Sequence, residues 1–333
     1  MSPKVYGIGN TLIDIFFNVT DENLTKLGLH KGTMHLINLE RRSELLEYTK
    51  LSEPHYSCGG SAPNTLITLS LFGVKTALAG KIGIDKFGSI YEEKLSELDI
   101  FSELKTCGSS TGSSIILITP DSERTMNTYL GANREFSADD INPDLIAASD
   151  YFYFTGYMWD TENQKNAILK TIKIAEKNGT KVIFDVADPF AVSRNRDDFL
   201  DLIKNHTYIT FANGEESRIL FDNYDAGECA KSLGKLCPVA VVKNGKHGSY
   251  IFSDGELMEI PVKGKSPVDT TGAGDTYAAG FILGLCRNFS LYDSGLLASF
   301  LAGEIVQKHG AQFSGKKAAA LGELLNSDEW RTI

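Results

Sequence analysis

Short β-prone runs alternate with longer stretches of helical periodicity along most of the chain, and this alternation constrains the fold more than any other feature of the sequence. A strand followed by a covering helix is the repeating unit of a parallel sheet, because parallel strands need a long crossover connection. In residues 161–178 the apolar positions fall on roughly one helical face, and Asn178-Gly179 can cap the C-terminus of that helix. The predicted strands are residues 5–9, 76–82, 151–155, 181–186, 208–212 and 239–243.

Two regions depart from this alternation. Residues 11–37 and 113–129 carry patterns that are typical of antiparallel strands. We expect them to form a small separate sheet that closes over a substrate as a lid. The predicted division is an α/β nucleotide-binding core and a β lid, formed by residues 1–10, 39–106 and 132–333 and by residues 11–38 and 107–131, respectively.

The formal net charge of −10 argues against binding to nucleic acid, because a phosphate backbone is held by clustered Lys and Arg. A single nucleotide is compatible with this charge, since one triphosphate needs only a few backbone N–H groups, a few cations and a metal ion. The five cysteines lack a Cys-x-x-Cys pair, which favours free thiols in a reducing compartment. No apolar run approaches the roughly 20 residues of a membrane helix. We therefore expect a cytoplasmic protein without a nucleic-acid or membrane partner.

The segment that carries the chemistry is Asp269-Thr-Thr-Gly-Ala-Gly-Asp275, which runs into small and apolar residues that can form a buried helix. Backbone N–H groups at the start of a helix are unpaired, and the helix dipole favours negative charge there. A phosphoryl group can therefore sit on Gly272, Ala273 and Gly274 without steric obstruction. Asp275 stands beside this cradle and can accept a hydroxyl proton, so two requirements of phosphoryl transfer are adjacent.

At these residues the sequence resembles the ribokinase, or PfkB-type, family of carbohydrate and nucleoside kinases, whose second signature is a D-T-x-G-A-G-D run. The family's earlier Gly-Gly signature matches residues 59–65. The resemblance implies a ribokinase-like three-layer α/β/α sandwich with a mostly parallel central sheet and a small β-sheet lid. It also implies ATP and Mg²⁺, with Asp275 as general base and residues 272–274 as anion hole. Further matching segments are Gly9-Asn10 with Asp14, residues 83–88, Asp188-Pro189-Phe190, residues 213–216 and Gly310-Ala311.

The same resemblance implies the nucleotide and ion contacts. Glu216 would act on magnesium indirectly, and Arg124 is the lid cation that could move onto the transferring phosphoryl group when the lid closes. Asp269 and Ser314 match positions that hold K⁺ in ribokinase-like members. The residues expected to contact ATP are Asn213, Glu216, Lys243, Gly245, Thr271 and Gly310.

The acceptor residues are implied by the end of the first strand and by the Gly-Gly signature. A carboxylate can accept two hydroxyl protons, and glycines let a sugar ring approach the backbone. The lid segments look closest to those of adenosine kinases, in residues 9–15, 31–34, 124–126 and 130–133. The expected hydroxyl-binding set is Asn10, Asp14, Gly59, Gly60 and Asn64, and the expected purine walls are Phe16, Met34, Tyr157 and Met158.

The expected reaction moves the γ-phosphoryl group of ATP to the 5′-hydroxyl of adenosine and gives AMP, as in purine salvage. Pro63 and Thr11 depart from common family patterns, and a sugar kinase acting on ribose, fructose or a related acceptor is the first alternative. A dinucleotide-dependent oxidoreductase is disfavoured, because Leu12 stands where the third glycine should be. A non-catalytic nucleoside-binding protein is opposed by the intact run ending at Asp275. The chain is expected to act as a monomer or homodimer.

Overall fold

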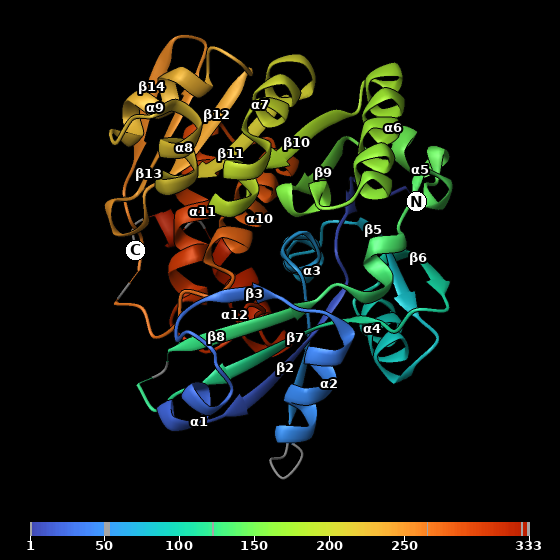
Figure 1. The fold of residues 1–333 in the computed structure, drawn as a ribbon. Helices are drawn as coiled ribbons and strands as arrows, with labels where there is room; N and C mark the ends of the chain where they lie inside the picture. Colours follow the sequence, from blue (N-terminus) through green and yellow to red (C-terminus); the bar gives the residue numbers. More distant parts are fainter. Residues whose placement is uncertain (1, 50–53, 122, 265, 328, 332–333) are drawn as a thin grey trace.

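A computed structural model describes residues 2–49, 54–121, 123–264, 266–327 and 329–331 (Figure 1). These residues form two sheets, and the larger has nine strands in the order β14-β13-β12-β11-β10-β9-β1-β5-β6. Neighbouring strands from β12 to β6 are parallel, whereas β13 and β14 add antiparallel at one edge. The strands are β1 (Val5–Ile8), β5 (Thr76–Gly83), β6 (Phe101–Cys107), β9 (Tyr151–Thr155), β10 (Lys181–Asp185), β11 (Ile209–Asn213), β12 (Val239–Lys243), β13 (Ser249–Ser253) and β14 (Glu256–Ile260).

Helices cover both faces of this sheet, because successive strand residues point to opposite sides. In β9, Phe152 and Phe154 pack into one apolar core while Tyr153 packs into the other. The predicted three-layer α/β/α fold is confirmed (Figure 1). The first core is closed by α5 (Pro143–Ala147), α6 (Glu162–Asn178), α7 (Pro189–His206), α8 (Gly214–Phe221) and α9 (Ala226–Leu233), and the second by α3 (Ser61–Leu71), α4 (Lys86–Glu97), α10 (Ala273–Cys286), α11 (Leu291–Ile305) and α12 (Gly315–Asn326).

The strands expected from the sequence are all present, with ends that differ by no more than one residue. The expected helix is α6, which Thr161 begins by accepting a hydrogen bond from the backbone N–H of Gln164, and which Gly179 ends. Strands β6, β13 and β14 are additional to those predicted. Short 3-10 turns complete the chain: η1 (Gly131–Glu135), η2 (Ala138–Asp140), η3 (Gly156–Trp159), η4 (Gly245–His247) and η5 (Glu329–Arg331).

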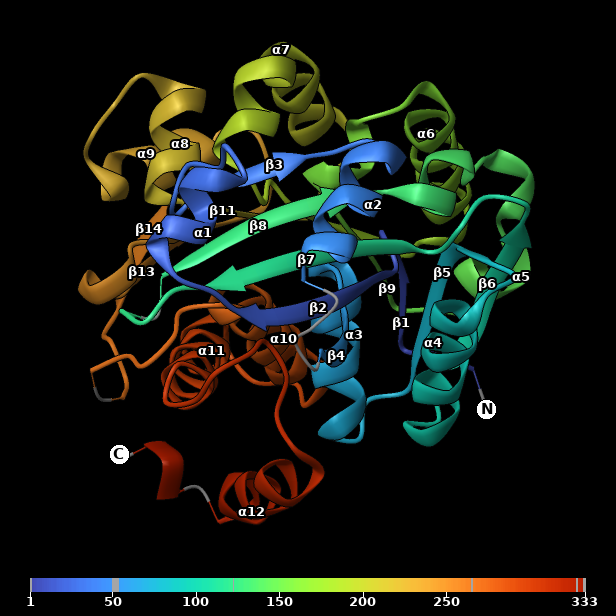
Figure 2. The ribbon, with the colours of Figure 1, turned by 60° about the horizontal axis from the view of Figure 1, so that its bottom comes forward.

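The smaller sheet has the strand order β3-β8-β7-β2-β4 and lies across α3 and α10 (Figure 2). Its pairing is mixed rather than antiparallel, because β2 and β7 leave the core side by side and run in the same direction. Helices α1 and α2 pack on its outer face through Leu24 and Leu45. The elements are β2 (Leu12–Asn18), α1 (Asp21–Lys26), β3 (Met34–Leu36), α2 (Leu39–Tyr48), β4 (His55–Gly59), β7 (Gly112–Ile118) and β8 (Arg124–Tyr129).

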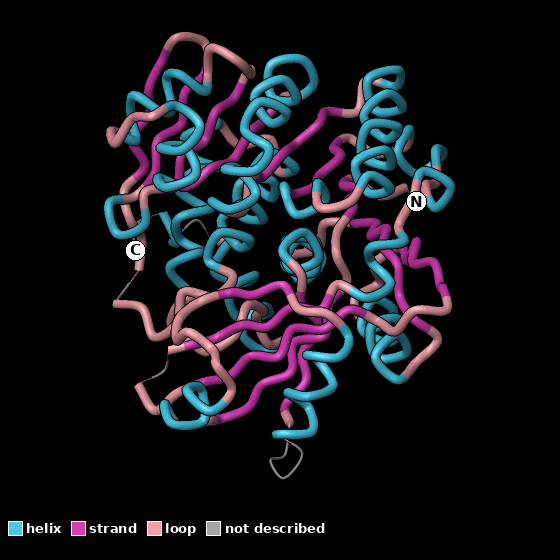
Figure 3. The backbone as a smooth tube through the Cα atoms, viewed as in Figure 1, coloured by secondary structure: helices cyan, strands magenta, loops and turns pink. Residues whose placement is uncertain are grey.

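The border between core and lid differs from the predicted one. Strand β4 pairs with β2 (Figure 2), and α2 packs on β7 and β8 (Figure 3), although both segments were predicted to belong to the core. The reason is that β4 completes the sheet edge next to β2 immediately before the chain enters α3. A buried amide joins the two parts, since Asn133 accepts from the backbone N–H of Thr11 at 2.8 Å and donates to its carbonyl at 3.0 Å.

Candidate active site

The segment predicted to form an anion cradle lies at the start of α10. Gly272 is the N-cap of this helix and has a left-handed backbone with φ of 74°. A Cβ at Gly272 would lie 2.6 Å from the Cα of Ala311, so only glycine permits this close approach. The helix behind it is buried, which fixes its first turn at the edge of a cavity, and the N–H of Ala273 donates to the carbonyl of Thr270 at 3.1 Å.

Asp275 lies in the first turn of α10 and is held on both carboxylate oxygens. The Ser61 hydroxyl donates to one oxygen at 2.6 Å, and the Asn64 amide donates to the other at 3.0 Å. Burial raises the pKa of Asp275 to about 6, while these two hydrogen bonds oppose the rise. The carboxyl group is therefore ionised at neutral pH but still basic enough to accept a proton from a hydroxyl group.

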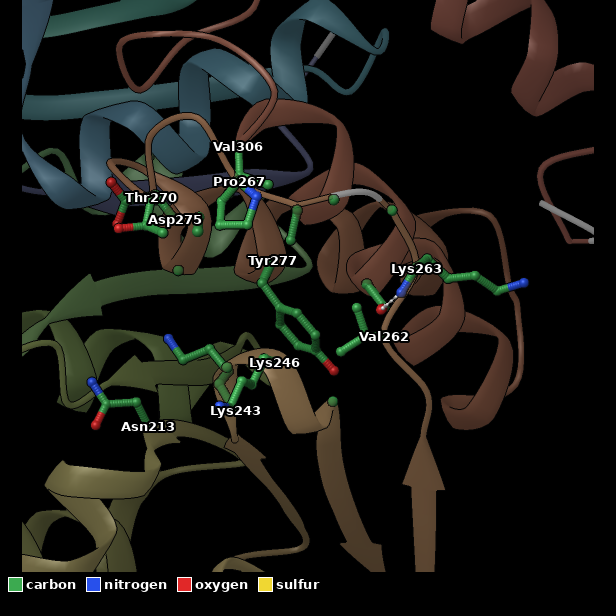
Figure 4. A pocket seen from close by; sticks show the side chains of 18 of the residues that line it. Asn213, Lys243, Lys246, Val262, Lys263, Pro267, Thr270, Asp275, Tyr277 and Val306 are labelled. Atoms are coloured by element: carbon green, nitrogen blue, oxygen red, sulfur yellow. Dashed lines mark hydrogen bonds between the residues drawn. The ribbon is translucent and has the colours of Figure 1, made fainter. Parts of the chain in front are cut away.

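A cavity of about 680 Å³ opens beside this cradle (Figure 4). Asp275 and Thr270 lie on one side of it, and Asn213 and Lys243 lie on the other. Asn213 and Lys243 end parallel strands, and ligands of α/β sheets bind outside the carboxyl ends of such strands. Apolar side chains also line the cavity, among them Val262, Pro267, Tyr277, Ala302 and Val306. Polar groups together with apolar walls match the two ends of a nucleotide.

A buried lysine faces the cradle. Lys243 forms an ion pair with Asp185 at 2.8 Å, and its Nζ would lie 3.4 Å from a Cβ at Gly274. Burial acts to lower the pKa of Lys243, but the nearby carboxylates of Asp185 and Glu216 outweigh it and the net pKa is raised. The lysine is therefore charged and adds a positive group to the anion site. Gly245 and Gly274 also line this cavity.

Asn213 and Glu216 form a capping box at the start of α8. The Asn213 side chain accepts from the backbone N–H of Glu216 at 2.9 Å, and the Glu216 carboxylate accepts from the backbone N–H of Asn213 at 2.7 Å. Glu216 is 1% exposed, and burial raises its pKa. The described residues contain no group of three His, Cys, Asp or Glu side chains that could enclose a metal ion. Glu216 and Asn213 fit a Mg²⁺ ion that phosphates and water hold, since Mg²⁺ keeps several waters.

Arg124 bridges the lid to the segment before the cradle. It forms an ion pair with Asp269 and a hydrogen bond to the hydroxyl of Thr271, and the two charged side chains are 10% and 7% exposed. The Asp269 carboxylate also accepts from the backbone N–H groups of Thr271 at 3.0 Å and Gly310 at 2.8 Å. Burial acts to raise the pKa of Asp269, but these hydrogen bonds outweigh it and the pKa is lowered.

The residues expected to hold potassium do not fit that ion in this structure. A guanidinium group already occupies the carboxylate of Asp269, and a second cation there would meet like charge. The hydroxyl of Ser314 is an N-cap of α12 that accepts from the backbone N–H of Lys317 at 3.3 Å. Arg124 therefore stands where a bound cation was expected.

A second cavity, of about 710 Å³, lies between the lid sheet and residues 308–314. Asp14 and Arg124 line its lid side, and Gln312 lines the opposite side. Burial raises the pKa of Asp14 to about 7; the Arg124 guanidinium opposes this rise and the Asp275 carboxylate adds to it. Phe16 adds an aromatic wall. A carboxylate that can accept hydrogen bonds from hydroxyl groups, together with aromatic side chains, is suited to a sugar or a nucleoside.

The other predicted acceptor residues are placed differently. Asn10 is 8% exposed and accepts from the Gln164 amide at 2.8 Å. Gly59 makes room for Asp14, because a Cβ at Gly59 would overlap the carboxylate. A Cβ at Gly60 would overlap the carbonyl of Asn10, so Gly59 allows a close approach within the lid sheet and Gly60 allows one where the chain enters α3. Met34 and Tyr157 are half-buried, and Met158 is 1% exposed in the apolar core.

Several site residues were not predicted from the sequence. Ser61 could have been found, because Ser61 and Asn64 are three residues apart at a helix start and share a face. Asp185 could also have been found, since it ends a parallel strand beside the strand that ends at Asn213. Gln312 and the apolar walls of the first cavity carry no local signal, because only tertiary contacts place them there.

The sequence profile described as "pfkB family carbohydrate kinase" matches residues 23–318. The structure is similar to a probable sugar kinase from Rhizobium etli, with 34% identity, a TM-score of 0.88, and coverage of 97% of this chain and 100% of that one. It is equally similar to adenosine kinase from Sinorhizobium meliloti, with 34% identity, a TM-score of 0.88, and coverage of 96% and 99%.

A curated relative adds a third acceptor. The 5-dehydro-2-deoxygluconokinase of Clostridium perfringens is 26% identical over 286 residues, which are 81% of this chain and 84% of the relative. Among the described residues, every helix is too short or too polar to cross a membrane. The comparisons thus agree on the kind of enzyme and name different acceptors.

Proposed function

The chain belongs to the pfkB family of carbohydrate kinases, and from this premise we propose that it transfers the γ-phosphoryl group of ATP to the 5′-hydroxyl of adenosine, giving AMP. The observation that carries the proposal is the position of Asp275, a buried and ionised carboxylate next to the anion cradle of α10. A cavity with apolar walls lies on one side of this group, and a cavity with an aromatic wall is joined to it through Asn64 and Gln312.

The chemistry follows from these positions. Asp275 accepts the proton of the attacking hydroxyl, whose oxygen then bonds to the γ-phosphorus while the bond to the β-phosphate oxygen breaks. The N–H groups of residues 272–274, with Lys243, stabilise the charge on the transferring group. Mg²⁺, when bound, neutralises charge on the phosphate oxygens of ATP. Arg124 lies next to Thr271 and can stabilise the same charge when the lid is closed.

Adenosine is favoured as acceptor by two observations. The chain matches the Sinorhizobium meliloti adenosine kinase over almost its whole length at 34% identity. Asp14 can accept hydrogen bonds from the two adjacent hydroxyl groups of a ribose, and Phe16 in the same cavity offers a flat surface to a purine ring. A second nucleoside would differ from adenosine only in contacts to its base.

A sugar is the second candidate. The Rhizobium etli relative is described as a probable sugar kinase at the same identity, and the Clostridium perfringens relative is named for a sugar acid. Lys308 and His309 line the second cavity beside Arg124, and this positive rim favours an acceptor that carries an acidic group. An intact base and anion cradle oppose a protein that binds nucleosides without phosphorylating them.

The test is ATP consumption by the purified chain with Mg²⁺, measured separately for adenosine, inosine, guanosine, ribose, fructose and 5-dehydro-2-deoxygluconate. The expected result is a kcat/KM for adenosine at least about tenfold above that of every other acceptor, equivalent to about 1.4 kcal/mol of transition-state binding. Preference for a free sugar would replace the acceptor and keep the mechanism. Turnover with none of them would contradict the proposed function.

A further inference from the structure

A chain of hydrogen bonds joins the lid strand β4 to the proposed base. The Gln312 amide nitrogen donates to the carbonyl of Cys58 in β4 and, at 3.0 Å, to the side-chain oxygen of Asn64 in α3. The Asn64 amide nitrogen then donates to Asp275 at 3.0 Å. The four residues come from four separate segments, so this arrangement exists only in the folded protein.

The donor and the acceptor in each of these hydrogen bonds follow from the first bond, in which the Cys58 carbonyl is the acceptor. A backbone carbonyl can only accept, so the amide nitrogen of Gln312 must face Cys58. The second N–H of that nitrogen then meets the oxygen of Asn64. With its oxygen occupied there, Asn64 has only its nitrogen to present to Asp275, and an ionised carboxylate can only accept.

We propose that Gln312 is a positioning residue that fixes the amide orientation of Asn64 and so keeps an N–H donor on the carboxylate of Asp275. The inference rests on the proposed kinase function, in which Asp275 is the base. Gln312 does not touch the reacting atoms in this role. It acts through Asn64, and it is the second residue in the loop that follows Gly310.

The energetic reason is that the two orientations of Asn64 have opposite effects. With nitrogen toward Asp275 the amide stabilises the ionised carboxyl group, and this contact opposes the rise that burial causes, which leaves the pKa at about 6. With oxygen toward Asp275 the amide would repel the ionised form and favour the protonated one. Among the described residues, Gln312 is the group that donates a hydrogen bond to the side-chain oxygen of Asn64, so its removal leaves that oxygen without this donor. Ser61 would still hold the other carboxylate oxygen.

The experiment compares wild type with Gln312→Met, which keeps the length of the side chain but removes the donor. The pH dependence of kcat at saturating acceptor is measured from pH 5 to 9 with ATP, Mg²⁺ and the best acceptor of the wild type, so that the titration of Asp14 in acceptor binding does not enter. We expect the acidic limb to move up by about one pH unit, the usual weight of one charge-assisted hydrogen bond. At pH 9 kcat should stay within about threefold of wild type, because the base is ionised in both proteins.

A double-mutant cycle shows whether Gln312 acts through Asn64. In Asn64→Ala, where the limb is already displaced, adding Gln312→Met should move it no further. Asn205→Leu is the control, since the exposed Asn205 amide donates to Asp201 at 2.8 Å, outside this chain of bonds and outside both cavities. If Gln312→Met fails to fold, Gln312→Leu tests the same point, because leucine cannot donate to Cys58 or Asn64 and adds no charge near Asp275.

Each outcome decides the matter. An unchanged acidic limb in an active Gln312→Met enzyme would overturn the inference and leave the kinase function intact. A raised acceptor KM with an unchanged limb would mean that Gln312 binds the acceptor directly, which also overturns it. An inactive wild type would instead reject the proposed function. A limb that moves equally with and without Asn64 would show that Gln312 does not act through that amide.

Discussion

The two cavities of the site are lined by groups from different parts of the fold. The nucleotide cavity is bounded by strand ends and by the first turn of a buried helix, and its charged side chains, such as Lys243 and Asp275, belong to these core elements. The second cavity lies between the lid sheet and a loop, and side chains such as Asp14, Arg124 and Gln312 provide its polar surface. Groups at strand ends and helix starts are positioned by the fold itself, whereas the lid side chains that line the acceptor cavity can be exchanged without changing the fold. This difference explains how relatives with one phosphoryl-transfer apparatus can be named for different acceptors.

The largest expected effect lies at the junction of the two cavities. Asp275→Asn should lower kcat by about 10³-fold while the affinity for ATP changes little, because an amide keeps the shape but cannot accept the proton. Steady-state kinetics and calorimetric ATP binding measure the two quantities. Asp197→Asn is the matched control at a side chain that is 97% exposed. Full turnover of Asp275→Asn would contradict the role of Asp275 as the general base between the two cavities.

The next effect concerns the lid. Arg124→Ala should lower kcat/KM by about 10²-fold, since it removes a positive group beside Thr271 and leaves the buried Asp269 unpaired. Wild-type activity should be the same in KCl and in NaCl, because Arg124 occupies the carboxylate that a cation would use. In Arg124→Ala that carboxylate is released, and KCl should restore part of the activity and raise the melting temperature. Potassium activation of the wild type would contradict this reading of the ion pair.

A smaller effect is the pH dependence, which distinguishes the role of Asp275 in turnover from that of Asp14 in acceptor binding. Activity requires ionised Asp275, so kcat at saturating acceptor should rise about tenfold per pH unit up to about 6 and then level off. Acceptor affinity requires ionised Asp14 and should keep improving until the pH passes about 7. Because both pKa values lie above those of an unfolded chain, each group stabilises the fold most at low pH and loses that contribution as the pH rises. Asp14→Asn should remove only the upper limb.

The smallest effect tests where the acceptor cavity ends. Met158→Leu should leave the acceptor KM within about twofold of wild type, because Met158 is buried in the apolar core rather than in the second cavity. Phe16→Leu should raise that KM more, since Phe16 lines the cavity. Measuring both with adenosine gives the comparison directly. A larger effect at Met158 would place the base of the acceptor deeper, as the sequence alone suggested.

The sequence by itself determined six strands of the large sheet and helix α6, because periodicity and caps are local properties that tertiary contacts reinforced, whereas β6, β13 and β14 were not predicted. It also placed the Gly272–Gly274 turn next to Asp275, since these residues are adjacent and stand at the start of a helix. The border of the lid was less accurate. Whether β4 joins the small sheet depends on a pairing with β2, more than 35 residues away, and no local pattern reports it.

Only the tertiary structure decided how the cradle and the base are supported. Asp275 is tuned by Ser61 and Asn64, which are more than 200 residues away in the chain. Asp269 is paired with Arg124 rather than left open for a cation, and Gln312 reaches Asn64 from the opposite end of the sequence. These contacts connect distant segments through single side chains. Their presence depends on how helices and sheets pack, and the residue types at these positions are compatible with many other partners.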